Sequence, residues 1–156
     1  MRFIFVLLLI LLVFVILGVM RTAQTQSQPQ EQAFMNGAVP SPAPDGFLKG
    51  SVSVPTTWLG KTFHAQTQTG INIIADNGKQ VEKYPFKTYV GNGYFSKNHP
   101  VLKLDYNLPE NPLYLRFVLD ELVQISPGQY LGKLIVRFGP FVVALGFFTL
   151  SKEPSN

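Results

Sequence analysis

Residues 130–150 read YLGKLIVRFGPFVVALGFFTL, and they predict two β-strands, 130–138 and 141–151. Successive side chains of a strand point to opposite faces, so the first strand has one apolar face and one face that carries two cations. The second strand is apolar on both faces, which a strand with one face in water would not be. The expected fold is therefore mainly β, a small antiparallel barrel that is closed or half-closed.

Shorter alternating stretches predict the other strands, and turn residues separate them: 47–54, 71–75, 80–86, 101–106 and 119–125. Asn77 and Gly78 supply the two positive-φ positions of a type I′ turn, which predicts a β-hairpin around them. Pro127 and Gly128 suit the centre of a type II turn before the strand that begins at residue 130. Pro85 indicates that its strand ends there or lies at a sheet edge.

Two parts of this interpretation leave alternatives open. Residues 111–118 lack strict alternation, and Pro112 after Asn111 makes one or two helical turns about as compatible with the pattern as a strand. An immunoglobulin-like sandwich is the alternative to the barrel, because it also consists of short antiparallel strands.

The N-terminal segment predicts a membrane anchor, residues 1–21. Residues 3–20 carry no charge, and as a helix they would span about 27 Å, close to the thickness of a bilayer core. A cleaved signal peptide is the alternative, but cleavage after Ala23 would put Arg21 where a small residue is needed. Arg2 and the amino terminus precede the segment and Arg21 follows it, which favours a cytoplasmic N-terminus and an extracytoplasmic domain.

Residues 22–45 are rich in glutamine and proline and poor in apolar side chains, so we expect a disordered, flexible linker. The barrel domain is then expected over residues 46–152, and residues 153–156 are expected to be a disordered tail. The chain has no cysteine, so the stability of this domain must come from its core.

The single tryptophan lies in the segment 56–63, whose pattern is Thr56-x-Trp58-x-Gly60-Lys61-x-Phe63. Lipocalins and their calycin relatives carry Gly-x-Trp near the first strand. A poorly characterised group with Gly-x-Trp-x-Gly-Lys-x-Phe is similar in layout, although Thr56 replaces its first glycine. Later motifs also resemble that group: Leu104-Asp105-Tyr106, Asp120-Glu121 and Tyr130-Leu131-Gly132-Lys133. The resemblance implies a lipocalin-like barrel whose closed end is plugged by the Trp58 indole, and an apolar ligand.

Charge and residue types argue against several functional classes. From residue 46 onward, eleven lysines and arginines face seven acidic residues, but the cations are scattered, which is untypical of nucleic-acid binding. They are more compatible with attraction to anionic membrane lipid. His64 and His99 are the only histidines, so we expect no metal site and no cofactor. No catalytic constellation emerges, and we do not expect an enzyme.

These observations predict a membrane-tethered binding module for an apolar or amphiphilic small molecule, similar to a lipid or fatty acid. The candidate ligand-binding residues are Trp58, Lys61, Tyr106, Lys133 and Arg137. One account places Lys133 or Arg137 inside the barrel, where the cation would bind a ligand carboxylate. The other account has these residues face outward or pair with charged residues across strands. The alternative function is a non-catalytic accessory or assembly subunit, which would contact a membrane-protein partner through the apolar face of residues 141–150.

Overall fold

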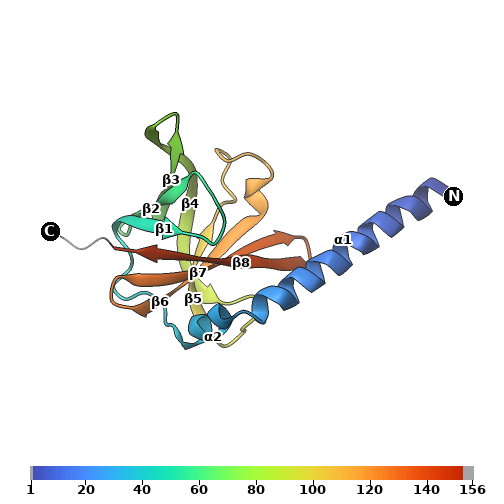
Figure 1. The fold of residues 1–156 in the computed structure, drawn as a ribbon, viewed down its shortest axis with the longest axis horizontal. Coiled ribbons are helices and arrows are strands. Elements are labelled where there is room, and N and C mark those ends of the chain that lie inside the picture. The colour runs from blue at the N-terminus through green and yellow to red at the C-terminus, as the bar shows by residue number, and fades with distance from the viewer. Residues whose placement is uncertain (1, 153–156) are drawn as a thin grey trace.

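The computed structural model describes residues 2–152, and it confirms the predicted mainly-β barrel (Figure 1). Eight antiparallel strands follow one another around a closed barrel, so the sandwich alternative is wrong. This architecture is compatible with a lipocalin-like layout. The strands are β1 (Gly46–Ser51), β2 (Trp58–His64), β3 (Thr69–Asp76), β4 (Lys79–Asn92), β5 (Pro100–Asp105), β6 (Val118–Ser126), β7 (Gln129–Phe138) and β8 (Phe141–Ser151).

The two predicted turns connect strands as expected, whereas the prediction at Pro85 was wrong. Asn77 and Gly78 have φ values of 50° and 76° and join β3 to β4, and Gly128, with φ of 70°, lies in the turn from β6 to β7. β4 does not end at Pro85 but runs for 14 residues, from Lys79 to Asn92. A register shift opposite it, between Gly70 and Asn72 of β3, accommodates a residue that cannot donate a ladder hydrogen bond.

Of the uncertain segment 111–118, the structure makes a 3₁₀ turn, η1 (Leu115–Phe117), before β6 begins at Val118. The barrel interior holds a continuous apolar core to which every strand except β3 contributes a buried side chain, namely Leu48, Phe63, Phe86, Leu102, Leu104, Tyr106, Leu122, Tyr130, Phe148 and Leu150. In β7 this puts the apolar face inside and the face with Lys133 and Arg137 outside.

The closing seam of the barrel is short, and a helix completes it. β1 pairs with β8 at only three positions, from Lys49↔Ser151 to Ser51↔Thr149. Further along β8, helix α1 (Arg2–Gln26) lies at the edge that β1 leaves open. Thr25 donates a hydrogen bond to the Ala144 carbonyl (3.0 Å), and the Ala144 N–H donates to Thr22 Oγ1 (3.1 Å). The helix thereby satisfies backbone groups that a longer β1 would have paired.

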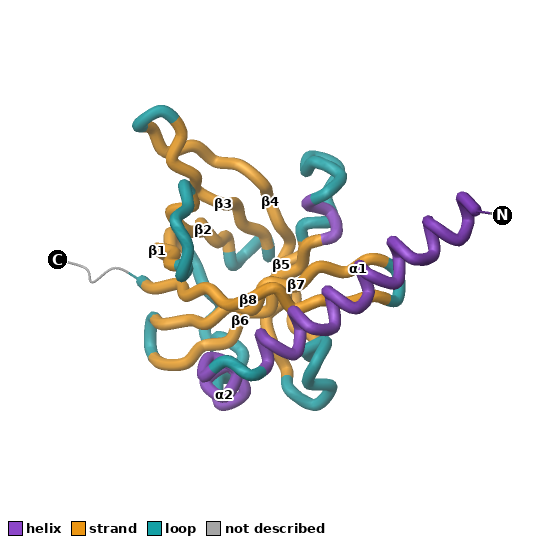
Figure 2. Tube along the Cα trace, turned by 45° about the vertical axis from the view of Figure 1, so that its right-hand side comes forward, coloured by secondary structure: helices purple, strands orange, loops and turns teal. Residues whose placement is uncertain are grey.

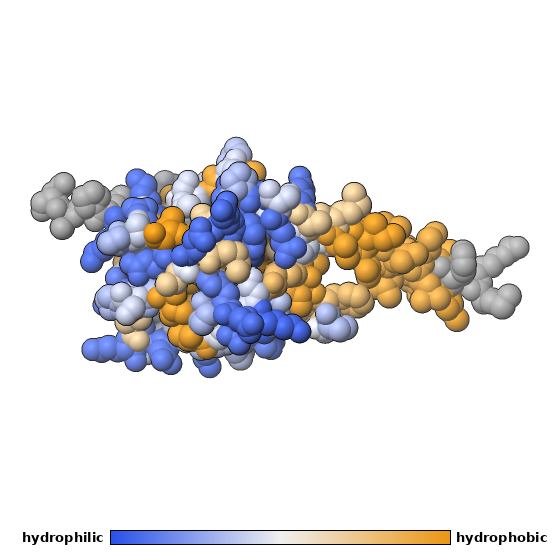
Figure 3. Space-filling model, turned by 90° about the horizontal axis from the view of Figure 1, so that it is seen from below, coloured by the Kyte–Doolittle hydropathy of each residue, from blue (hydrophilic) through white to orange (hydrophobic). Residues whose placement is uncertain are grey.

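The rest of α1 projects away from the barrel, as Figures 1 and 2 show. Its segment Val6–Gln26 is long and apolar enough to cross a membrane, and the described apolar side chains of its N-terminal half are exposed. Figure 3 shows this apolar rod beside a barrel surface that is largely hydrophilic. The prediction of one N-terminal helix of this kind is confirmed.

The segment expected to be a flexible linker is instead packed against the barrel. It contains α2 (Pro29–Asn36), whose Phe34 is fully buried against the outer wall beside Val123 and Leu131. Glutamine, glutamate, alanine and methionine are good helix formers, and one deeply buried phenylalanine suffices to dock so short a helix. After α2, Ala38 pairs with Gln124 of β6. The predicted tail, residues 153–156, lies outside the described residues.

Candidate functional site

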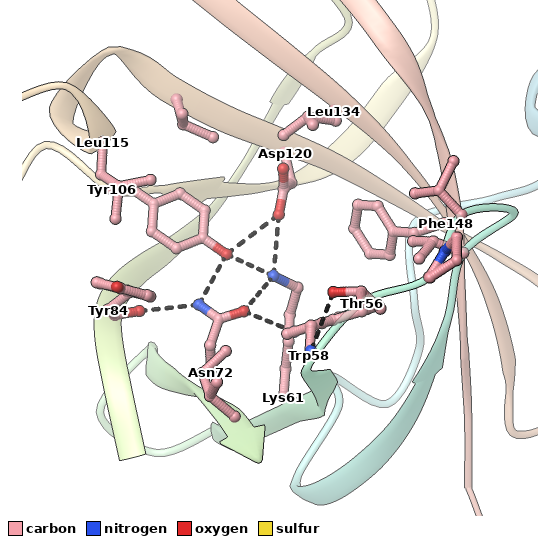
Figure 4. Close-up of a pocket in the computed structure, with 15 residues that line it drawn as sticks. Thr56, Trp58, Lys61, Asn72, Tyr84, Tyr106, Leu115, Asp120, Leu134 and Phe148 are labelled. Atoms are coloured by element: carbon pink, nitrogen blue, oxygen red, sulfur yellow. Dashed lines mark hydrogen bonds and ion pairs between the residues drawn. The ribbon is translucent and has the colours of Figure 1, made fainter. Parts of the chain in front are cut away.

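A cavity of about 410 Å³ occupies one end of the barrel interior (Figure 4). The opposite end is filled by aromatic rings, with the Phe63 and Phe86 centroids 5.4 Å apart, and buried Pro40 and Pro44 border that end from outside. The cavity walls are mostly apolar, and two charged side chains reach into them. The lining residues are Val52, Val54, Pro55, Thr56, Trp58, Lys61, Asn72, Ile74, Tyr84, Tyr106, Leu115, Val118, Asp120, Leu134 and Phe148.

A β-bulge in β2 brings Trp58 and Lys61 into the same cavity. Strict alternation would place side chains three residues apart on opposite faces of the strand. The pairing with β3 shifts between Trp58 and Gly60, so Leu59 is the extra residue of the bulge. The side chains of Trp58 and Lys61 therefore both face inward. Gly60 is required here, because a Cβ atom would lie 2.1 Å from the Leu48 carbonyl oxygen and its φ is 150°.

Lys61 is the centre of a buried polar cluster. Its ammonium group lies 3.0 Å from Asp120 Oδ2 and donates a hydrogen bond to Asn72 Oδ1 at 2.9 Å. It also contacts the hydroxyl of Tyr106. The side chains of Lys61 and Asp120 are only 4% and 3% exposed. The three N–H donors of the ammonium group are therefore all used within the protein.

Four aromatic rings surround the ammonium group of Lys61, with centroids 5.2–5.3 Å away: Trp58, Phe86, Tyr106 and Phe148. A cation near ring faces is attracted by their quadrupoles, which offsets part of the cost of removing it from water. Burial nevertheless lowers the pKa of Lys61, and the charge of Asp120 and its hydrogen bond oppose that effect. The charge on Lys61 is therefore stabilised by Asp120, Asn72 and the four rings, and not by water.

Asn72 and Tyr106 link the remaining members of the cluster. The indole N–H of Trp58 donates to Asn72 Oδ1 at 2.9 Å, and the Asn72 amide donates to the Tyr84 carbonyl (2.9 Å) and to the Tyr106 hydroxyl (3.1 Å). That hydroxyl donates in turn to Asp120 Oδ2 at 3.2 Å. Burial raises the pKa of Tyr106 well above its ordinary value, and the nearby carboxylate of Asp120 adds to the shift. Tyr106 thus remains a hydrogen-bond donor.

One polar atom of this cluster has no partner within the described part of the chain. Asp120 Oδ2 accepts from both Lys61 and Tyr106, but Asp120 Oδ1 is buried without a hydrogen bond. A buried carboxylate oxygen left unpaired is costly, and a donor in the cavity would reach this atom only if neighbouring side chains moved.

The structure brings together three of the five predicted site residues, Trp58, Lys61 and Tyr106. Lys133 and Arg137 do not reach the interior, because they lie on the outer face of β7, which is the alternative that the sequence had left open. Lys133 pairs with Glu31 of α2 at 2.8 Å and lies 4.3 Å from the ring centroid of Phe34. Arg137 pairs with Asp105 at 2.6 Å and donates to the Tyr94 hydroxyl at 3.1 Å.

Sequence reasoning missed Asn72 and Asp120. The sequence did contain a signal for Asp120, because it lies in an apolar strand next to Leu119. A buried charge in such a strand needs a partner, which suggests a polar cluster. The partner of Asp120, Lys61, is far away in the sequence, so only the barrel register reveals the pair. Trp58 was also assigned to the wrong place, because it is half-buried in the cavity wall and does not plug the closed end.

The apolar face of residues 141–150, expected to contact a partner protein, is covered in part by the chain itself. Phe147 packs against Phe34 of α2, with ring centroids 6.2 Å apart, and Ala144 is buried beside Thr25 of α1.

Within residues 2–152, no group of three or more histidine, cysteine or acidic side chains is placed to hold a metal ion. Comparison of the chain with protein-family models, curated proteins and solved structures finds no match.

Proposed function

We propose that this chain is a membrane-tethered barrel that binds one apolar or amphiphilic small molecule in its interior. The observation that carries the proposal is the cavity of about 410 Å³, which has mostly apolar walls and one ion pair, between Lys61 and Asp120. Pockets for small ligands are commonly about 300–1,000 Å³ and combine apolar walls with few polar groups. The resemblance of the Trp58 segment to lipocalin-like proteins supports the same reading.

The charges of the cavity favour a neutral polar end on the ligand. Lys61 and Asp120 are the only charged side chains in the cavity wall, and they neutralise each other. A fatty-acid carboxylate would find no unpaired cation in this wall and would lie near the like charge of Asp120, whereas an alcohol or amide carries no charge to neutralise. We therefore expect a long-chain alcohol, a monoacylglycerol or a molecule of similar chemistry in place of the fatty acid suggested by sequence.

The location belongs to the same proposal. α1 is retained as an anchor, and the barrel lies on the extracytoplasmic side, as the charges around the apolar segment favour. A barrel held at the bilayer would exchange an amphiphile with the lipid beside it. The accessory-subunit alternative has less support, because its expected contact face is partly covered by Phe34 and α1.

Trp58 fluorescence gives a direct test, because it is the only tryptophan and lies in the cavity wall. The full chain is reconstituted in lipid nanodiscs and titrated with a long-chain alcohol brominated on its chain, since bromine quenches indole on contact. We expect saturable quenching by the alcohol. The dissociation constant of the matching brominated acid should be at least about tenfold higher, which corresponds to about 1.4 kcal/mol of binding free energy.

The control pair is Val118→Phe and Val90→Phe. Val118 lines the cavity, so the larger ring should narrow it and weaken the quenching, whereas Val90 is 60% exposed and the same change there should leave quenching intact. Quenching that does not saturate, or that Val118→Phe leaves unchanged, would show that the bromine reaches Trp58 from the bilayer and would contradict the proposal.

A further inference from the structure

The turn between β7 and β8 is unusually apolar for an exposed hairpin tip. Phe138 and Phe141 flank Gly139 and Pro140, and their side chains are 65% and 46% exposed. The Phe138 ring touches that of Phe117, with centroids 5.1 Å apart, which connects the tip to the loop before β6. In that loop Leu113 and Tyr114 are 69% and 67% exposed. Large apolar side chains thus gather at one end of the barrel, which is typical of a contact surface.

This end of the barrel lies against α1. A Cβ atom on Gly18 would lie 2.9 Å from the Val143 side chain, so helix and strand are in close contact there. Beyond Gly18, an apolar cavity of about 320 Å³ lies between the helix and the hairpin, with Phe14 on one side and Phe138 and Phe141 on the other. The apolar tip is therefore continuous with the apolar surface of α1, as Figure 3 also shows at the base of the rod.

Hydrogen bonds fix the level of the tip along α1. Arg21 donates to the Leu145 carbonyl at 2.8 Å, so Leu145 of β8 lies next to the turn of α1 that carries Arg21. Phe14 lies about 10 Å from Arg21 along the helix axis, at about 1.5 Å per residue. Phe141 lies about 13 Å from Leu145 along β8, at about 3.3 Å per residue. Both estimates put the hairpin tip beside Phe14, well inside the apolar part of the helix.

We propose that the tip of the β7–β8 hairpin inserts into the outer leaflet of the bilayer that α1 spans. A bilayer is the occupant that fits, because a spanning helix with Arg21 at the headgroups carries the attached tip about 10 Å below them. Amphipathic elements bury apolar side chains about 5–10 Å into the region between headgroups and acyl chains. Aromatic and aliphatic side chains such as Phe138, Phe141 and Leu113 suit that depth.

The inference rests on the proposed membrane placement of α1 but not on any ligand in the barrel. Because the chain has no cysteine, single labels can be introduced cleanly. Phe138→Cys and, separately, Phe141→Cys report on the tip, while Asn77→Cys reports on the exposed turn of the β3–β4 hairpin and serves as control. Each full-length variant is labelled with an environment-sensitive fluorophore and reconstituted in phosphatidylcholine vesicles.

We expect the labels at positions 138 and 141 to emit at shorter wavelength than the label at 77. They should be quenched at least several-fold more strongly by lipid with a nitroxide on its acyl chain, and less by a water-soluble quencher. Equal access of the water-soluble quencher to positions 138, 141 and 77 would overturn the proposal. Protection from both quenchers would also overturn it, because a second copy of the chain would then cover the tip. Neither readout depends on Trp58 quenching, so insertion and ligand binding can fail separately.

Discussion

Gly60 and Lys61 decide the chemistry of the barrel interior. The glycine allows the bulge that turns both Trp58 and Lys61 inward, and the lysine then needs the carboxylate of Asp120 to remain charged without water. Buried ion pairs contribute little to stability by themselves, because desolvation cancels most of the attraction. The pair is therefore better explained by a role in the cavity than by a gain in folding free energy.

Replacing only one member of this ion pair should lower the free energy of unfolding far more than replacing both members. Lys61→Met leaves Asp120 buried without its cation and should lower the free energy of unfolding by about 3–5 kcal/mol. The double variant Lys61→Met with Asp120→Leu should recover most of that loss, since no unpaired charge remains. Thermal unfolding of the full chain in mild detergent, followed by Trp58 fluorescence, measures both.

The matched control is Lys83, whose ammonium lies 3.1 Å from Asp76 with both side chains more than 40% exposed. Lys83→Met should cost less than about 1 kcal/mol, because water screens an exposed pair. Similar losses at Lys61 and Lys83 would mean that the interior pair is hydrated, and that the cavity is wet.

At the scale of elements, α2 and the chain after it belong to the barrel. Phe34 fills the space between the outer wall and the helix, and Lys133 lies above its ring while bonding to Glu31. The cation on β7 thus fastens a helix to the wall instead of binding a ligand. Pro40 and Pro44 are buried at the filled end of the barrel.

Phe34→Ala should destabilise the domain by about 3–5 kcal/mol, the usual range for removing a large buried ring. Gln32→Ala, on the exposed face of the same helix, should change the free energy of unfolding by no more than about 0.5 kcal/mol. Chemical unfolding of both variants in detergent measures the difference. If the free energy of unfolding of Phe34→Ala equals that of the unmutated chain, Phe34 does not dock α2, and the segment is the flexible linker that its composition predicted.

Seven of the eight strands and both hairpin turns could be predicted from sequence because their signals are local, whereas β2 (Trp58–His64) was not predicted as a strand. Asn77-Gly78 fixes one hairpin through its own backbone preferences, and the doubly apolar strand 141–151 indicates a covered element wherever it lies. The docking of Phe34 could not be predicted, because one phenylalanine in a glutamine-rich segment has no periodic signal. Strand alternation could not predict that Trp58 and Lys61 face the same side, because the bulge depends on a contact between Gly60 and β1.

At the scale of the whole molecule, one apolar rod and one barrel are joined rigidly by hydrogen bonds to Leu145 and Ala144. We expect the full chain to stay in the membrane fraction after washing with alkaline carbonate. A chain that begins at Arg21 should be released and remain folded, because it keeps the polar contacts of α1 and all of α2. The measurement is fractionation followed by immunoblotting and circular dichroism.

A chain that begins at Gly46 is the informative comparison, since it lacks Phe34, Pro40 and Pro44. It should be less stable than the chain from Arg21, and we expect a lower melting temperature. A mature N-terminus near Ala23, found by mass spectrometry of the native protein, would instead establish cleavage and remove the anchor.

The short seam between β1 and β8 also sets the order of events during synthesis. Its partners, such as Lys49 and Ser151, are roughly a hundred residues apart, and β8 is synthesised after the other strands of the barrel. Contacts this distant in sequence form slowly, because a long loop must close before they stabilise anything. By then α1 and β1 have both been made, so β1 waits with one edge unpaired until β8 is complete. Loss of residues 149–151, which pair with β1, would leave the sheet open at this seam.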